Sequence, residues 1–293
     1  MTGAERGLLL LTCPLGEAVS VMTPTGYFRA AERMKQAARP DQPDRELTEA
    51  DLRQLGFPAG QAEWISRLLS REQILDRYLE RAARLDISVL TRLSPEYPVN
   101  LIYRLENQAP VALFCKGDRS LLQTPCVGLV GSRALLPEGR RFAEQVGRLA
   151  AEEGYTLVSG GAEGADRAAQ EACLAAGGSV IVFTPGELIK CPARDRILYC
   201  AEEGIDLPFT AHRALARNRL IHGLGEKTFV AQCPEQRGGT WRGSVENLRN
   251  CRTPLFVHRD GSRGTEALIA MGGEPVTALT SLKDAEPAQT TMF

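Results

Sequence analysis

The sequence predicts an α/β protein in which a domain built on a parallel sheet follows a small helical N-terminal domain. Helical periodicity dominates up to about residue 85, and short apolar strands alternate with helices from about residue 86. Glycine-rich turns directly follow two of those strands. The 293 residues suit one large domain and one small one. We therefore expect a helical module over residues 1–85, a sheet domain over 86–282 and a flexible tail over 283–293.

In the N-terminal part, residues 28–38 continue a helical period and residues 39–44 form a polar, proline-bearing loop. Thr48 is a predicted N-cap, with Asp51 three residues later as its capping partner. Apolar positions then recur on one helical face over residues 62–85. This stretch predicts a single long amphipathic helix.

The second part alternates between strands and helices, which is typical of a parallel sheet covered on both faces. The expected strands are 111–115, 127–130, 156–158, 180–183, 228–231, 255–257 and 275–277. The expected helices are 137–153, 165–176, one near 245–249 and one near 265–271. In such a sheet the carboxyl ends of the strands meet at one edge, where ligands bind.

Overall composition narrows the function. Apolar residues make up 43% of the chain and charged residues 24%, as in ordinary globular proteins. The apolar run at residues 8–11 is far shorter than the roughly 20 residues of a membrane span, and Pro14 follows at once. We expect a cytoplasmic protein with no membrane partner. The net charge of −1 exerts no global attraction on nucleic acid, so an anion site has to be local.

Cysteine, histidine and arginine usage adds further limits. The eight cysteines contain no Cys-x-x-Cys pair, and the three histidines show no ligand spacing with them, so we expect reduced thiols, no metal site and no cofactor. Arginine outnumbers lysine by 30 to 5. The guanidinium fork suits phosphate, but codon bias also explains the ratio, so only arginines in special places count as evidence.

The first candidate binding segment follows the expected strand 127–130. Gly131 lets the backbone approach a ligand, Ser132 offers a hydroxyl, and Arg133 completes a cradle for an anion. A strand that ends in glycine is common, so this turn alone is weak evidence.

The second segment follows the next strand. It contains Ser159, Gly160, Gly161, Gly164 and Asp166. Free N–H groups at the start of the following helix suit a phosphate. The spacing is neither that of a dinucleotide fingerprint nor that of a Walker A loop. Asp166 has the alternative role of capping its own helix.

The third segment, at the expected start of a helix, holds Arg217, Asn218 and Arg219. Cations at a helix N-terminus oppose the macrodipole, which indicates a bound anion there. The alternative is an exposed arginine pair.

The fourth segment is a glycine-rich loop after the strand 228–231. Its candidate residues are Gly238, Gly239, Thr240, Trp241, Arg242 and Ser244. The glycines and hydroxyls make a second nest of donors, and Trp241 is placed to stack on a base unless it anchors the loop by packing.

Together these segments resemble the DNA-processing protein family, DprA or Smf, over about residues 93–275. The resemblance is carried by Tyr97-Pro98 with Leu101, residues 110–114 with Gly117, residues 130–133, Ser159-Gly160 with Gly164 and Asp166, Gly177-Gly178, and residues 217–219 with Gly223-Leu224. It implies an extended Rossmann-like domain of the SLOG superfamily. It also implies a homodimer that binds single-stranded DNA without sequence preference, without catalysis, and passes the strand to a RecA-type recombinase during transformation. The family's phosphate pocket corresponds to Gly131, Ser132, Arg133, Ser159, Gly160, Arg217 and Arg219.

The sequence departs from the family at several points. Gln170 replaces a histidine, and no winged-helix segment follows the sheet domain. An alternative is a nucleotide sensor or a nucleoside-monophosphate phosphoribohydrolase of the same superfamily. Asn247 stands where that enzyme has its catalytic glutamate, and Glu246 is one residue away, about 100 degrees around a helix. Since asparagine is no general acid or base, this argues against hydrolysis but leaves nucleotide binding open.

Overall fold

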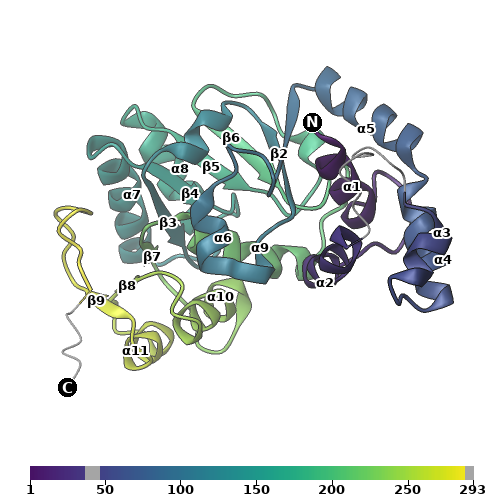
Figure 1. Cartoon of the computed structure of the whole chain (residues 1–293). Helices are drawn as coiled ribbons and strands as arrows, with labels where there is room; N and C mark the ends of the chain where they lie inside the picture. The colour runs from purple at the N-terminus through teal and green to yellow at the C-terminus, as the bar shows by residue number, and fades with distance from the viewer. Residues whose placement is uncertain (37–46, 288–293) are drawn as a thin grey trace.

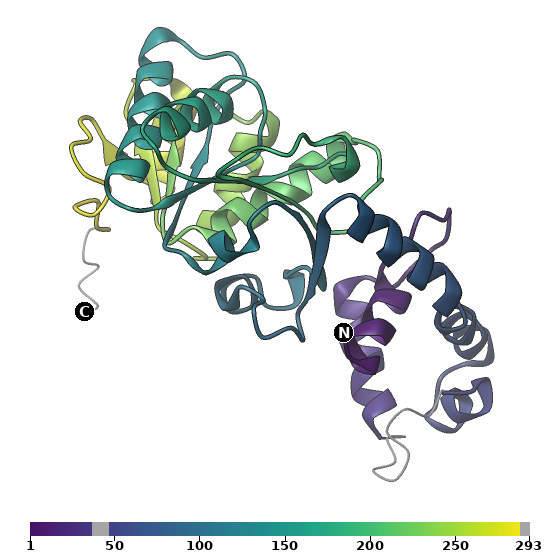
Figure 2. The ribbon, with the colours of Figure 1, turned by 90° about the horizontal axis from the view of Figure 1, so that it is seen from above.

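The computed structural model describes residues 1–36 and 47–287 and shows a helical lobe beside a sheet domain (Figures 1 and 2). The lobe comprises α1 (Gly3–Thr12), α2 (Pro24–Lys35), α3 (Glu49–Gln54), α4 (Ala59–Leu69) and α5 (Glu72–Arg84). The proline-bearing loop expected at 39–44 lies outside the described residues, as does the end of the helix expected over 28–38. The predicted α/β class with preceding helices is confirmed.

Two features of the helical lobe test the sequence prediction. The Thr48 side chain caps α3, and the Asp51 carboxylate accepts a hydrogen bond from the Thr48 amide, so the predicted capping box is confirmed. The single helix predicted over 62–85 is wrong, because the chain breaks between α4 and α5. At the break Arg71 is 7% exposed, and its guanidinium donates to the carbonyl oxygens of Leu10, Cys13, Pro14 and Leu68. The break turns this side chain inward, where it satisfies carbonyls at the ends of α1 and α4.

The described part of the sheet domain has nine strands in the order β1-β2-β6-β5-β4-β3-β7-β8-β9. They are β1 (Ile87–Thr91), β2 (Ala112–Lys116), β3 (Cys126–Val130), β4 (Thr156–Ser159), β5 (Val180–Phe183), β6 (Ile197–Ala201), β7 (Thr228–Val230), β8 (Leu255–His258) and β9 (Glu274–Val276). From β6 to β9 all neighbours are parallel, as predicted.

The other edge of the sheet corrects the prediction. Strands β1 and β6 were not expected, and β2 pairs antiparallel with both. A short 3-10 turn at Leu188–Lys190, rather than a long helix, lies between β5 and β6, so the alternation of strand and helix breaks down there. The periodicity therefore gave no sign of β6.

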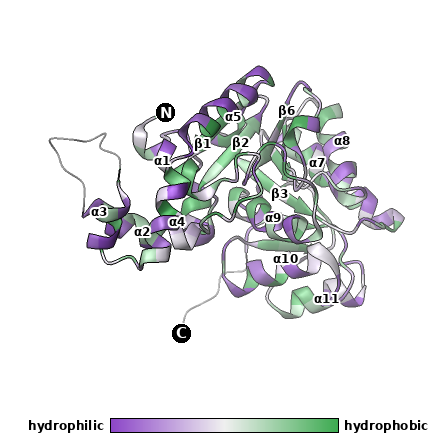
Figure 3. Ribbon diagram, turned by 90° about the vertical axis from the view of Figure 1, so that its right-hand side faces the viewer, coloured by the Kyte–Doolittle hydropathy of each residue, from purple (hydrophilic) through white to green (hydrophobic). Residues whose placement is uncertain are grey.

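Helices cover both faces of the sheet. On one face lie α7 (Pro137–Glu152) and α8 (Ala165–Ala175), together with residues 279–282. The other face carries α6 (Val99–Leu105), α9 (Ala211–Leu224), α10 (Gly238–Arg249) and α11 (Arg263–Ala270). Figure 3 shows the central strands mostly in the hydrophobic colour and hydrophilic residues along helices such as α5 and α8. The two apolar layers therefore sandwich the sheet.

A third apolar cluster joins the helical lobe to the sheet domain. Leu9 of α1 and Leu75 and Tyr78 of α5 share it with Phe114 of β2 and with Ile205, which follows β6. These five side chains are no more than 5% exposed. The two parts of the molecule therefore have a common core on this side of the sheet.

The last described residues are held against the sheet domain. The Lys227 ammonium donates to the carbonyl oxygens of Leu282 and Ala285, and the Glu153 carboxylate accepts from the backbone of Leu282 and Lys283. The residues just after position 282, expected to begin a flexible tail, thus have fixed partners. Among the described residues no helix is both long and apolar enough to cross a membrane.

Candidate functional site

A cleft of about 670 Å³ opens where β3 ends. Three chain segments supply most of its walls: residues 130–134 after β3, residues 209–218 at the start of α9, and residues 234–242 before and within α10. Ala162 and Asp166, from the turn after β4 and from α8, complete it. The four segments singled out in the sequence thus converge on one site at the carboxyl edge of the parallel strands.

Most of the predicted residues line this cleft. They are Gly131, Ser132, Arg133, Asp166, Arg217, Asn218, Gly238, Gly239, Thr240 and Arg242. Ser159, Gly160, Gly161, Gly164, Arg219, Trp241 and Ser244 do not line it. Four arginines reach it from different elements, three of them exposed (Arg133, Arg237, Arg242) and one buried (Arg217).

Arg217 lies in the middle of α9, not at the predicted helix start, so the argument from the helix dipole is wrong. Its side chain is 7% exposed, and Nη1 donates to the Phe183 carbonyl oxygen over 2.9 Å, whereas Nε has no partner among the described residues. Burial lowers the pKa of Arg217, and the nearby Asp166 opposes this. A second anion in the cleft would favour its charged form.

Gly160 makes room for this arginine. A Cβ at position 160 would lie 1.6 Å from Nη1 of Arg217, so only glycine fits beneath the guanidinium. The residue thus shapes the floor of the cleft without lining it.

The protein's own groups accept hydrogen bonds from some of the amides in the turn after β4. One carboxylate oxygen of Asp166 accepts from the Gly160 and Ala162 amides, each over 3.1 Å, and the Ser132 carbonyl accepts from Ala165 at the start of α8. Burial raises the pKa of Asp166, and Arg217 opposes this rise. The protein's own acceptors therefore occupy part of the place expected for a phosphate, and the Asp166 carboxylate ties the turn rather than capping its helix.

The remaining residues of this turn have structural roles. Ser159 is buried and its hydroxyl accepts a hydrogen bond from the Gln170 side chain. Gly161 and Gly164 have φ angles of +70° and +87°, which favour glycine. A Cβ on Gly164 would lie 2.4 Å from the carbonyl oxygens of Ser132 and Arg133, so this glycine lets the two turns touch.

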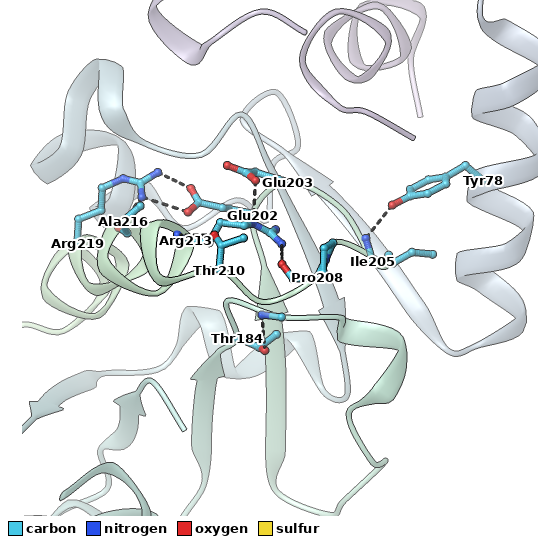
Figure 4. A network of polar contacts seen from close by, with 11 residues as sticks. Tyr78, Thr184, Glu202, Glu203, Ile205, Pro208, Thr210, Arg213, Ala216 and Arg219 are labelled. Atoms are coloured by element: carbon cyan, nitrogen blue, oxygen red, sulfur yellow. Dashed lines mark hydrogen bonds and ion pairs between the residues drawn. The ribbon is translucent and has the colours of Figure 1, made fainter. Parts of the chain in front are cut away.

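Arg219 faces away from the cleft, which corrects its assignment as an anion-binding residue. It forms an ion pair with Glu202 and donates to the Ala216 carbonyl oxygen over 2.6 Å (Figure 4). It also donates to the Gln108 carbonyl oxygen over 3.1 Å. The arginine pair of the sequence is thus divided: one member enters the cleft, and the other ties α9 to its surroundings.

The glycine-rich stretch 238–244 is the start of α10 rather than a loop. No side chain caps α10, and its first residues, Gly238, Gly239 and Thr240, line the cleft, with the Thr240 hydroxyl donating to the Gly131 carbonyl oxygen over 2.8 Å. The N-terminus of α10 therefore adds amide donors to the cleft. Trp241 packs on the apolar core and Ser244 is fully buried, so stacking by Trp241 is not supported.

Among the lining residues that sequence reasoning missed, Arg237 and Phe209 bring a charge and an aromatic ring to the cleft. Arg237 precedes α10, and Phe209 precedes α9 with 58% of its surface exposed. An aromatic residue just before the Thr210 N-cap was a usable signal for Phe209. Arg237 is the residue directly before the glycine-rich stretch, and the prediction included only the residues that follow it.

The residues of the alternative hydrolase lie elsewhere. Asn247 is buried and donates to the Thr253 carbonyl oxygen over 2.7 Å, and Glu246 pairs with Arg252 over 2.9 Å. Among the described residues, Asp166 is the only carboxylic acid that lines the cleft. Within residues 1–36 and 47–287, no group of three or more His, Cys, Asp or Glu side chains is arranged to hold a metal ion.

The charges of the cleft favour an anionic ligand. None of Arg133, Arg237 and Arg242 has an acidic partner within 4.0 Å among the described residues, whereas many arginines on the helices form ion pairs. Their positive charge is therefore available to a ligand, and the amides of α10 point to the same space.

The fold and the cleft define a Rossmann-like α/β protein with an arginine-lined cleft at the carboxyl edge of its sheet. A family model described as DNA recombination-mediator protein A matches residues 88–285. The chain belongs to this family, so the resemblance inferred from its motifs is confirmed.

Curated relatives agree. The chain is 30% identical over 187 residues to protein Smf of Synechocystis, and this match covers 59% of the chain and 47% of that protein. It is 34% identical over 184 residues to DNA processing protein DprA of Streptococcus pneumoniae, covering 58% of the chain and 64% of that protein. The chain thus spans about half to just under two thirds of the length of these relatives.

Solved structures extend the likeness to the fold. The X-ray structure of DprA from Streptococcus pneumoniae matches 88% of this chain and 95% of its own with a TM-score of 0.67 and 26% identity. DNA processing protein A from Helicobacter pylori, whose structure concerns its mode of binding single-stranded DNA, matches 66% of this chain and 92% of its own, with a TM-score of 0.55 and 25% identity.

Proposed function

We propose that this chain binds single-stranded DNA through the phosphate backbone, in the cleft between the β3 turn, α9 and α10, and that it carries out no chemical step. The observation that carries the proposal is the convergence of three unpaired, exposed guanidinium groups with the uncapped N-terminus of α10. Guanidinium and amide donors recognise phosphate oxygens, which every nucleotide presents alike. We therefore expect little preference for sequence.

The cleft also explains why a near-neutral chain would bind DNA. The net charge is −1, but Asp166 is the only acid that lines the cleft in the described part of the chain. It is 6% exposed, and its carboxylate accepts from two backbone amides. The local field is therefore set by the arginines, and it attracts an anion over a short range.

The test is the binding of a fluorescent oligo-dT by anisotropy at low salt. Arg133→Ala removes one exposed guanidinium from the cleft, and we expect affinity to fall by about three- to tenfold. Arg148→Ala is the matched control, since Arg148 is an exposed arginine on α7 that pairs with Glu152. No binding at low salt, or equal losses in both variants, would overturn the proposal.

Membership of a family described as recombination mediators supports a partner as well as a ligand. We propose that the bound strand is passed to a RecA-type recombinase during DNA processing in transformation, and that the working unit is a homodimer. Light scattering measures the second point directly. Stimulation of recombinase filament formation on oligonucleotides by the native chain, but not by Arg133→Ala, measures the first.

A further inference from the structure

Phe209 is an exposed aromatic side chain in a cleft whose other lining residues are arginines and smaller polar or aliphatic residues. Of the large apolar side chains that are exposed in the described part of the chain, it is the one that lines the cleft. A phenylalanine that is 58% exposed leaves much of its apolar surface in water. A flat ligand group laid against the ring would remove that surface from water.

The backbone on both sides of Phe209 is fixed. Nη1 of Arg213 donates to the Pro208 carbonyl oxygen over 3.0 Å, and its Nε donates to Glu203 over 3.0 Å. The Thr210 hydroxyl accepts from the Arg213 amide over 3.1 Å and so caps α9. Figure 4 shows Arg213 reaching from α9 to this segment. A ring on a fixed backbone loses little conformational freedom when a ligand binds.

Helix α5 of the N-terminal lobe holds the start of the same segment. The Tyr78 hydroxyl accepts from the Ile205 amide over 2.7 Å (Figure 4). It also donates to the Asp206 carboxylate over 3.1 Å. Arg81, one turn further along α5, pairs with Asp206 over 2.7 Å. Residues 202–210, which will be called the 202–210 loop, are therefore anchored to α5 before Phe209 and to α9 after it.

We propose that Phe209 stacks on one nucleobase of the bound strand, and that Tyr78 of the N-terminal lobe is a positioning residue that holds the 202–210 loop for this contact. The inference rests on the proposed function. Arginines and amides account for phosphate binding but do not bind the bases. A phenyl ring binds a base by stacking and has no sequence preference, because every base presents a π-face.

The first experiment compares two ligands of equal length and charge. One is oligo-dT, and the other is an oligonucleotide of abasic residues with the same phosphates. We expect the native chain to prefer oligo-dT by roughly tenfold, the typical contribution of one stacked base. Phe209→Ala should bind both ligands with the affinity that the native chain has for the abasic one, and Phe209→Trp should keep the preference.

Arg133→Ala is the matched control, since it should weaken both ligands equally. Equal affinity of the native chain for the two ligands, or a preference that survives in Phe209→Ala, would refute stacking by Phe209 and leave phosphate binding intact. Failure to bind either ligand at low salt would instead refute the proposed function. The two failures are therefore distinguishable.

The second experiment tests the positioning role. Tyr78→Phe removes the acceptor of the buried Ile205 amide, and we expect the preference for oligo-dT to fall toward one while affinity for the abasic ligand is unchanged. Ser94→Ala is the control, because it removes a different contact of the lobe, the 2.7 Å hydrogen bond from Ser94 to Glu5. Should Tyr78→Phe fail to fold, Arg81→Ala removes the ion pair between α5 and Asp206 and should lower the preference for oligo-dT in the same direction. A lower melting temperature with an unchanged preference would overturn the positioning role.

Discussion

The salt dependence of DNA binding can be worked out from the cleft. Each phosphate that a guanidinium neutralises on a single strand contributes a slope of about −0.7 to the plot of log affinity against log salt. Four arginines line the cleft, so the native chain should show a slope of about −2.8. A rise from 50 to 200 mM salt should then weaken binding roughly 50-fold.

The perturbation is the removal of the exposed guanidiniums, singly and together. Arg133→Ala should have a slope of about −2.1 and lose roughly 18-fold affinity over the same range. A triple variant that also carries Arg237→Ala and Arg242→Ala retains only the buried Arg217. Its slope should be about −0.7, which is a loss of roughly threefold.

The assay is fluorescence anisotropy of labelled oligo-dT at several salt concentrations, with Arg148→Ala as the control that keeps the native slope. Two results would refute the reasoning: a native slope shallower than about −1, or a triple variant whose slope equals that of the native chain. Either would mean that the arginines of the cleft do not neutralise DNA phosphates.

Three further predictions concern stability. Gly164→Ala should lower the free energy of unfolding by more than about 3 kcal/mol in chemical denaturation, because its φ is +87° and the new Cβ meets two carbonyl oxygens at 2.4 Å. The control Gly154→Ala, with a φ of +81° and open space around it, should lower it by only about 1 kcal/mol. Equal losses in the two variants would contradict the close contact at Gly164. Burial and the nearby Arg252 lower the pKa of His222 to about 3, so protonation favours the unfolded state. The free energy of unfolding should therefore fall by about 1.4 kcal/mol per pH unit below pH 6.5. The variant His222→Gln should flatten this slope, and identical pH profiles of the two proteins would exclude a role of His222. Arg71→Met should destabilise the helical lobe by about 2–4 kcal/mol, because it leaves buried carbonyl oxygens unpaired. The loss is measured as a lower denaturation midpoint. A change below about 0.5 kcal/mol would refute the role of Arg71 in pairing these carbonyls.

The fold was largely predictable because its strands and helices are marked by local signals. Apolar strands that end in glycine, the proline at the start of α7 and the stop at Gly154 all appear in the sequence within a residue or two of their observed places. Strand β6 was not predictable in this way, since the segment before it is not a long helix. The break before α5 was also hidden, because Arg71 is buried by contacts with residues about sixty positions earlier.

The location of the site was predictable, whereas the work of individual residues was not. Strand ends in a parallel sheet share an edge, so the segments around Gly131, Gly160 and Gly238 were expected to meet. The acceptor of the Gly160 amide in the turn after β4 is the Asp166 side chain, and the sequence alone does not show that this side chain reaches the turn. Arg217 lines the cleft whereas Arg219 does not, because Arg219 pairs with Glu202. The sequence gives no reason to place Glu202 beside α9.

The apolar cluster shared by Leu9, Tyr78, Phe114 and Ile205 has a practical consequence for dissecting the molecule. A shortened chain starting near residue 86 would present the uncovered face of β2 to water and tend to aggregate. Loss of DNA binding after such a truncation would therefore say nothing about the helices themselves. Their contribution has to be measured by single substitutions in the intact chain.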